Sequence, residues 1–272
     1  MNFTVLGASG FIGRHLVQHL REGGAPVYAP PRQESGDDLD AVLGHALGHV
    51  FYCIGLTADF RQRPFDTVET HVCLLRRLLQ HGRFDSLTYL SSTRVYLGAA
   101  STREDEILLA QPGNADHLYN LSKLMGESLC LHSGRNTRVV RLSNVYGPDF
   151  GSGNFLSAVL REAAATGRIL FQTAAASSKD YVALDDVVRW LPEIATRGRE
   201  RIYNLARGRN VSNQEIAVAL EQVGVQVEFA SDAPVWTFPA IETARVRTEF
   251  GAAQRDLPHD LAGLLDEFRN SR

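Results

Sequence analysis

The sequence has few residues of the kinds that indicate a disulfide framework or a membrane protein. Its 272 residues include three cysteines, Cys53, Cys73 and Cys130, which form no C-x-x-C pair and cannot all pair with one another. This usage suits a reducing compartment, and we expect a cytoplasmic protein whose cysteines are core residues. No apolar run reaches the roughly 18 residues of a membrane helix, and a strand-like run begins almost at once. We therefore expect neither a membrane segment nor a signal peptide.

An excess of charge of either sign is also absent. The 28 Lys and Arg residues against 31 Asp and Glu residues leave a net charge of −3. Such a chain has no general attraction to nucleic acid or to an anionic membrane, so we expect neither as a partner. His15 and His19 stand four residues apart on a predicted helix, but no third ligand is evident, and we expect no metal site.

Strand-like and helix-like segments alternate along the chain without internal repeats. This alternation predicts an α/β fold with a doubly wound parallel sheet, covered by helices on both faces. The segment 32–38 leaves little room for the usual third strand, which we expect to be abbreviated. The predicted strands are 2–6, 26–30, 49–54, 86–91, 138–142 and 202–205, and the predicted helices are 11–23, 38–47, 61–82, 115–134, 154–167, 185–196, 212–223, 242–250 and 258–269.

Glycines recur in the turn between the first predicted strand and the first predicted helix. The segment reads Gly7-Ala8-Ser9-Gly10-Phe11-Ile12-Gly13, a G-x-x-G-x-x-G spacing. Glycines there allow the backbone to approach a pyrophosphate, and the helix N-terminus presents free N–H groups to that anion. The turn therefore predicts a dinucleotide site, although the spacing differs from G-x-G-x-x-G.

Two further segments carry groups suited to proton transfer. Tyr119 and Lys123 are four residues apart, which places both side chains on one face of a helix. A nearby ammonium favours a phenolate, so we expect Lys123 to lower the pKa of Tyr119. The strand-like run 87–90 leads into hydroxyl-bearing residues, and the carboxyl end of a parallel strand is where open α/β sheets bind ligands.

Taken together, the motifs resemble the extended short-chain dehydrogenases/reductases, specifically the NAD(P)-dependent nucleotide-sugar epimerase/dehydratase family. The resemblance extends over nearly the whole chain. It implies a Rossmann-type fold in which 1–146 and 179–205 bind NAD(P), while 147–178 and 206–272 form a small, discontinuous substrate-binding part. Five segments match in order, namely Gly7 to Gly13, Ser91-Ser92-Thr93-Arg94-Val95-Tyr96, Tyr119 to Lys123, Arg141-Leu142-Ser143-Asn144-Val145-Tyr146-Gly147-Pro148, and Lys179-Asp180-Tyr181-Val182-Ala183-Leu184-Asp185-Asp186-Val187, with Tyr203-Asn204-Leu205-Ala206-Arg207-Gly208 as a weaker sixth.

The resemblance also implies residue roles. The catalytic hydroxyl falls on Ser92, with Ser91 and Thr93 as neighbours that could be confused with it. The catalytic pair falls on Tyr119 and Lys123, and the lysine also holds the nicotinamide ribose. The expected cofactor contacts are Gly7, Ser9, Gly10, Phe11, Ile12, Gly13, Cys53, Val145, Tyr119 and Lys123. The expected substrate contacts are Arg94, Asn144, Asn154 and Lys179, of which Asn144 matches a diphosphate-contacting asparagine and Lys179 stands where the family usually has a phosphate-binding arginine.

Some positions depart from the family pattern. Leu97 stands where a glycine is common, His71 where an asparagine is common, and Ala183 where a histidine is common. The sugar 4,6-dehydratases carry an acidic pair where this chain has Thr93 and Arg94, which argues against dehydration. Arg94 could instead face the substrate pyrophosphate or cap a loop. Trp236 could stack on a base or hold the late loop in place.

The segment after the second predicted strand bears on the choice of cofactor. A ribose 2′-hydroxyl is usually bound by an acid there, and none stands at the strand end. Arg32 and Arg14 could neutralise a 2′-phosphate, which favours NADP(H), although both could be solvated charges and the acids Glu34, Asp37 and Asp38 might reach back.

Two outcomes of the implied chemistry remain open at this stage. We expect a nucleotide-sugar epimerase or a keto-sugar reductase, and the alternative is a regulatory protein that binds the cofactor without turnover. The family often dimerises through two helices, which here are 61–82 and 115–134, so a homodimer is expected.

Overall fold

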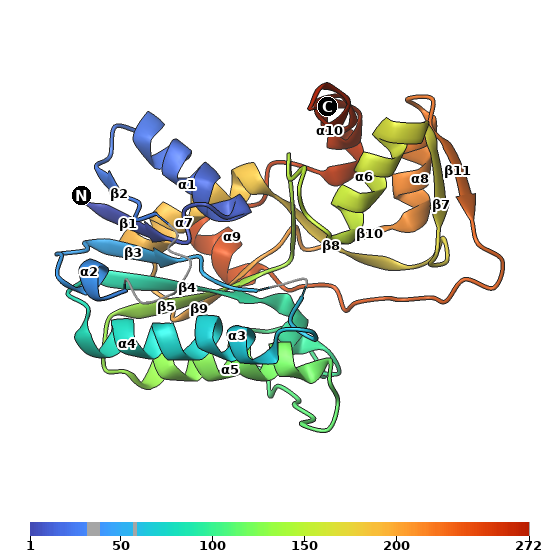
Figure 1. Cartoon of the computed structure of the whole chain (residues 1–272). Helices are drawn as coiled ribbons and strands as arrows, with labels where there is room; N and C mark the ends of the chain where they lie inside the picture. The colour runs from blue at the N-terminus through green and yellow to red at the C-terminus, as the bar shows by residue number, and fades with distance from the viewer. Residues whose placement is uncertain (32–38, 57–58, 272) are drawn as a thin grey trace.

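A six-stranded parallel sheet forms the centre of the larger part of the molecule (Figure 1). The computed structural model describes residues 1–31, 39–56 and 59–271. The strand order is β2-β1-β3-β4-β5-β9, and every neighbouring pair is parallel. The predicted doubly wound fold is therefore confirmed. The strands are β1 (Phe3–Leu6), β2 (Val27–Tyr28), β3 (His49–Tyr52), β4 (Ser86–Ser92), β5 (Thr137–Leu142) and β9 (Ile202–Leu205).

Helices cover both faces of this sheet. On one face α1 (Phe11–Glu22) packs beside α7 (Leu184–Arg197), and their apolar sides form one buried cluster with the strands. On the other face lie α4 (Leu74–His81) and α5 (His117–His132), which bury a second cluster. Helices therefore enclose the sheet from two sides, and its ligand-binding edge is left at the strand ends.

The predicted helix 61–82 consists of three consecutive pieces. It starts with α3 (Pro64–Val68), continues as a π-helical turn over Glu69–Cys73, and ends with α4. π-Helical turns inside helices often occur at functional sites. The predicted helix 38–47 is shorter in the structure, where α2 covers Leu39–Leu43.

The strand order changes direction between β1 and β3. The chain leaves β1 to form β2 on one side and returns to form β3 on the other, with Leu6 opposite Tyr52. In an open α/β sheet this switch point creates a crevice at the carboxyl ends of the strands. Among the described residues no strand lies between β2 and β3. Residues 32–38, where the abbreviated third strand was expected, lie outside the described part.

A second, smaller part of the molecule has its own hydrophobic core, built from α6, α8 and α10. This separate core supports our proposal that 147–178 and 206–272 form a distinct part beside 1–146 and 179–205. Its elements, together with the short sheet strands beside them, are β6 (Asn144–Tyr146), α6 (Phe155–Thr166), β7 (Arg168–Phe171), β8 (Ser178–Ala183), β10 (Asn210–Ser212), α8 (Asn213–Glu221), β11 (Gln226–Phe229), α9 (Ala244–Phe250) and α10 (Leu257–Asn270).

The strands of this part were not predicted. They are only three to six residues long and pair with distant segments, as β10 does with β8 and β11 with β7. A run of that length shows no clear period, so only its partner identifies it as a strand. None of the helices in the described residues is long and apolar enough to span a bilayer.

Candidate active site

The glycine-rich turn after β1 owes its shape to two of its three glycines. Gly7 has a φ of +84°, and a Cβ there would lie 2.8 Å from the carbonyl carbon of Cys53. A Cβ on Gly13 would overlap the carbonyl oxygen of Gly7. Gly10 is different, because its φ of −75° suits any residue and its Cβ would lie 3.3 Å from that same oxygen. Gly7 and Gly13 thus bring strand and helix together, whereas Gly10 lines the adjacent cavity.

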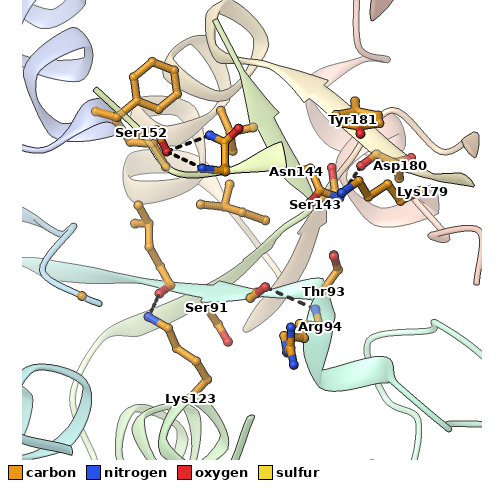
Figure 2. Close-up of a pocket in the computed structure, with 18 of the residues that line it drawn as sticks. Ser91, Thr93, Arg94, Lys123, Ser143, Asn144, Ser152, Lys179, Asp180 and Tyr181 are labelled. Atoms are coloured by element: carbon orange, nitrogen blue, oxygen red, sulfur yellow. Dashed lines mark hydrogen bonds between the residues drawn. The ribbon is translucent and has the colours of Figure 1, made fainter. Parts of the chain in front are cut away.

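A cavity of about 420 Å³ opens at the carboxyl edge of the sheet (Figure 2). Its walls come from the turn before α1, the ends of β3, β4 and β5, helix α5 and loops of the smaller part. Most of the predicted site residues line it, and Gly7, Ser9 and Arg14 do not. Those that line it are Gly10, Phe11, Ile12, Gly13, Cys53, Ser92, Arg94, Tyr119, Lys123, Asn144, Val145, Asn154 and Lys179.

The free N–H groups at the start of α1 face an anion more readily than a cation. No acidic side chain lies in the first turn of α1, so nothing there repels a phosphate. Together with the bare backbone at Gly10, this arrangement fits the pyrophosphate of a dinucleotide. The described residues contain no group of three His, Cys, Asp or Glu side chains that could hold a metal ion.

Tyr119 and Lys123 lie on the buried side of α5 and face the end of β4. The Lys123 ammonium donates a hydrogen bond to the carbonyl oxygen of Leu90 at 2.9 Å (Figure 2) and lies 5.8 Å from the centre of the Tyr119 ring. The Ser92 side chain is a hydrogen-bond partner of Tyr119, and its oxygen also accepts from the backbone N–H of Arg94 at 3.2 Å. The three predicted catalytic residues therefore converge in one place.

Burial dominates the ionisation of this group. It raises the pKa of Tyr119, against the opposing effects of the Ser92 hydrogen bond and the positive charge of Arg94. Burial also lowers the pKa of Lys123 to about 7, although the charges of Glu127 and Cys53 act in the other direction. The expectation that Lys123 lowers the pKa of Tyr119 was wrong for this structure, because loss of solvation outweighs the neighbouring ammonium.

Neighbouring contacts separate Ser92 from Ser91. The Ser91 hydroxyl donates to Glu127 at 2.5 Å, and Glu127 in turn forms a buried ion pair of 2.7 Å with Arg141. A hydroxyl held in this way belongs to the frame that joins α5 to β4 and β5. Ser92 is left as the hydroxyl beside Tyr119.

His71 is a residue of this site whose role the sequence did not reveal. It lies in the π-helical turn, fully buried, with its ring 5.4 Å from the Tyr119 ring in an edge-on arrangement. Its Nε2 accepts from the N–H of Leu56 at 3.2 Å, and its Nδ1 lies 2.8 Å from the hydroxyl of Ser122. Burial lowers the pKa of His71 to about 2, so the ring is neutral. The only signal for this residue was its departure from the family's asparagine.

The opposite wall of the cavity carries the predicted diphosphate contacts (Figure 2). The Lys179 ammonium lies 4.5 Å from the centre of the Phe155 ring and 5.6 Å from that of Tyr181, and burial lowers its pKa to about 8. The amide of Asn144 donates to the carbonyl oxygen of Asp180 at 2.7 Å. Asn154 accepts from the N–H of Ser157 at 2.9 Å, so its side chain caps helix α6.

Several other predicted residues have structural partners. The Arg14 guanidinium donates to the carbonyl oxygen of Pro148 at 3.3 Å and lies 3.9 Å from Asp149. This contact joins α1 to the loop after β6. Arg32 lies outside the described residues, as do Glu34, Asp37 and Asp38. The Trp236 side chain is 64% exposed, while its backbone hydrogen-bonds to Ser177 and Ser178.

The cysteines differ from one another in burial. Cys130 is fully buried, whereas Cys53 and Cys73 are only partly buried. The expectation of three core cysteines was therefore wrong for two of them. Cys53 follows β3 directly and so reaches the cavity wall, where burial raises its thiol pKa to about 12.

The fold and the cavity define a protein of the short-chain dehydrogenase/reductase type. The chain belongs to the NAD dependent epimerase/dehydratase family, whose model matches residues 3–206. The resemblance inferred from the motifs is thereby confirmed.

Known relatives cover most of the chain. It is 27% identical to a dTDP-glucose 4,6-dehydratase of Streptomyces griseus, over 100% of this chain and 95% of the relative. It is also 27% identical to a dTDP-4-dehydro-6-deoxy-D-allose reductase of Streptomyces bikiniensis, over 78% of each chain. Among solved structures, that of RMD from Pseudomonas aeruginosa complexed with NADPH has a TM-score of 0.85 at 22% identity, covering 100% of this chain and 99% of that one.

Proposed function

We propose that the protein is an NAD(P)-dependent oxidoreductase that acts on a nucleotide-diphosphate sugar, as a keto-sugar reductase or as an epimerase. The observation that carries the proposal is the convergence of Ser92, Tyr119 and Lys123 in the cavity beside the glycine-rich turn. Relatives that reduce keto sugars, including a GDP-6-deoxy-D-mannose reductase of Pseudomonas aeruginosa, support the same chemistry.

Each side chain has a distinct task in this reaction. When bound, the nicotinamide supplies or accepts a hydride at the sugar carbon. Tyr119 donates its phenolic proton to the carbonyl oxygen in the reducing direction and removes the hydroxyl proton in the oxidising direction. Ser92 holds the sugar oxygen by a hydrogen bond, and Lys123 supplies positive charge beside the phenol. At the other wall, Lys179 would hold a phosphate group with Asn144 beside it.

Dehydration is not supported by the residues that line the cavity. Asp149 and Asp180 are the acidic ones among the described residues. The carboxylate of Asp180 accepts from the backbone N–H groups of Arg207 and Gly208 at 3.0 and 2.7 Å. Elimination of a sugar hydroxyl needs an acid beside the leaving group, and the residue next to Ser92 and Thr93 is Arg94 instead.

Native mass spectrometry of the purified protein, followed by turnover assays, tests this proposal. Tightly retained NAD with interconversion of two sugars would identify an epimerase. Dependence on added NADPH with a keto sugar would identify a reductase. Firm cofactor binding without turnover on any keto sugar would instead support the alternative of a regulatory protein with the same fold.

We further propose a preference for NADP(H). The support is the lack of an acidic residue at the end of β2, where a ribose 2′-hydroxyl would need one. Because Arg14 is engaged with Pro148 and Asp149, Arg32 is the stronger candidate for a 2′-phosphate contact. Arg32→Ala should weaken NADPH binding by roughly 10- to 150-fold and leave NADH binding unchanged. Equal losses for both cofactors would contradict the preference.

We also propose a homodimer through the helical segments 61–82 and 115–134, and a cytoplasmic location. Three apolar side chains on these segments support the dimer, since Phe65 is 87%, Val68 38% and Met125 53% exposed. Helices α3 and α5 contact each other, so their exposed residues belong to one face of the molecule. Three unpaired cysteines support a reducing location.

A further inference from the structure

Three cationic side chains line the cavity, and none of them forms an ion pair in the part of the chain that the structure describes. They are Arg94, Lys123 and Lys179. Lys123 is occupied by the catalytic tyrosine, and Lys179 serves the diphosphate under the proposed function. Arg94 is the cation that this chemistry does not use.

The surroundings of Arg94 leave most of its donors without a partner. Its terminal nitrogen is 3.5 Å from the carbonyl oxygen of Asp116, a long contact, and its Nε is buried without a hydrogen-bond partner among the described residues. The nearby carboxylate of Asp116 is taken by Arg61 at 2.5 Å. A guanidinium that is partly buried and not neutralised is costly, unless a ligand supplies the missing charge.

Arg94 lies at the reacting end of the cavity and away from the diphosphate end. Its guanidinium carbon is 5.5 Å from the centre of the Phe60 ring, and the Phe60 ring is 5.5 Å from that of Tyr119. Figure 2 shows Arg94 at the turn after β4, whereas Lys179 projects from a different wall beside Asn144. A group bound by Arg94 must therefore sit on the sugar ring, close to the carbon that Tyr119 serves.

We infer that Arg94 recognises a carboxylate on the sugar, so that the substrate is a nucleotide sugar of the uronic acid class. The inference rests on the proposed function. A guanidinium matches a carboxylate with two parallel hydrogen bonds, which no neutral sugar substituent provides. Of the two acids that line the cavity among the described residues, Asp180 is held by backbone N–H groups and Asp149 lies near Arg14, so neither occupies this position.

Binding to matched pairs of nucleotide sugars tests the inference. The protein, saturated with NADPH or NADH, is titrated in a calorimeter with UDP-glucuronate and UDP-glucose, dTDP-glucuronate and dTDP-glucose, and GDP-mannuronate and GDP-mannose. For the nucleotide that binds, the acidic member should bind roughly 10- to 150-fold more tightly than the neutral one. In Arg94→Gln this difference should disappear while binding of the neutral sugar stays the same, and Arg94→Lys should keep part of it.

Two control variants separate the contact from general electrostatics. Lys179→Gln should weaken both members of a pair alike. Arg168→Gln removes an exposed positive charge from β7, outside the cavity, and should change neither. Thermal melting and cofactor titration establish that each variant is folded.

The outcomes separate this inference from the proposed function. If a neutral sugar binds as well as its acidic partner, or if Arg94→Gln weakens both equally, the carboxylate assignment is wrong and the proposed function stands. If no member of any pair binds to the cofactor-loaded protein, both the assignment and the proposed function are contradicted.

Discussion

His71 and Ser122 are 51 residues apart in the chain and 2.8 Å apart in the structure, joined by a hydrogen bond beneath the catalytic tyrosine. Because the Nε2 of the neutral His71 ring accepts from Leu56, its Nδ1 carries the proton and donates to Ser122. The Ser122 hydroxyl then donates to the backbone carbonyl of Tyr119 at 2.9 Å. One imidazole thus ties the loop after β3 to the start of α5.

This relay predicts that His71 is a positioning residue for Tyr119. In His71→Phe the two ends of the relay lose their partner, and a misplacement of about 1 Å at the reacting group costs on the order of 100-fold in turnover. We expect kcat to fall by that order while KM and cofactor affinity change little. Ser122→Ala removes only the lower half of the relay and should lower kcat less. A wild-type kcat in a folded His71→Phe variant would show that the relay has no part in catalysis.

Removing the phenolic hydroxyl tests the proton-transfer role directly. Tyr119→Phe should lower turnover by about 100-fold or more, the usual scale for a general acid or base, while dinucleotide binding persists. Tyr181→Phe is the matched control, since Tyr181 also lines the cavity with a hydroxyl that has no partner among the described residues. Near-normal turnover in Tyr119→Phe would refute its assignment.

The lowered pKa of Lys123 predicts a specific pH dependence of stability. Its ammonium loses protons near pH 7 when folded, against a reference value of 10.5. Between these values the unfolded chain binds more protons, so the contribution of Lys123 to stability rises with pH. Lys123→Met should therefore stabilise the ligand-free protein most below pH 7. That advantage should shrink by up to about 1.4 kcal/mol per pH unit up to pH 10.5.

Denaturant unfolding of both proteins at several pH values measures this difference. Lys179→Met is the control, because the pKa of Lys179 is lowered to about 8 and its effect should start correspondingly later. A difference between Lys123→Met and wild type that is constant with pH would mean that the Lys123 ammonium is not destabilised by burial. In assays with cofactor, the same variant should lose both cofactor affinity and turnover.

Two glycines of the same turn should respond in opposite ways to a side chain. Gly10→Val places its side chain in the cavity, so the fold should persist while dinucleotide affinity falls sharply. Gly13→Ala forces a Cβ onto the carbonyl oxygen of Gly7, so it should lower the melting temperature itself. Calorimetry and thermal melting of both variants separate the effects. Wild-type affinity in a folded Gly10→Val protein would mean that the turn binds no pyrophosphate.

The proposed dimer predicts that charge on its apolar face prevents association. Phe65→Glu combined with Met125→Glu should give a monomer of unchanged melting cooperativity, since both side chains are exposed in the single chain. Sedimentation velocity measures the mass in solution. Ile107→Glu, at another exposed apolar position, is the control and should leave the mass unaltered. A wild-type protein that sediments as a monomer would contradict the dimer.

Much of the fold could be read from local patterns. The six strands of the main sheet and the helices that cover it were predicted within a few residues, because long alternating segments carry strong apolar periodicity. Boundaries were less accurate, and the predicted strand 26–30 is only Val27–Tyr28 in the structure. The motifs around Gly10, Ser92 and Tyr119 were recognisable because each depends on the spacing of a few adjacent residues.

The sequence by itself determined the family, the parallel sheet and the identity of the reactive groups, since these follow from local spacing and periodicity. Only the tertiary structure decided how those groups are solvated and partnered. It made burial the dominant influence on Tyr119 and Lys123, and it joined His71 to Ser122 across half of the sheet. It also left Arg94 in the cavity without a carboxylate among the described residues. Solvation and partner choice depend on residues far apart in the chain, and no local pattern encodes them.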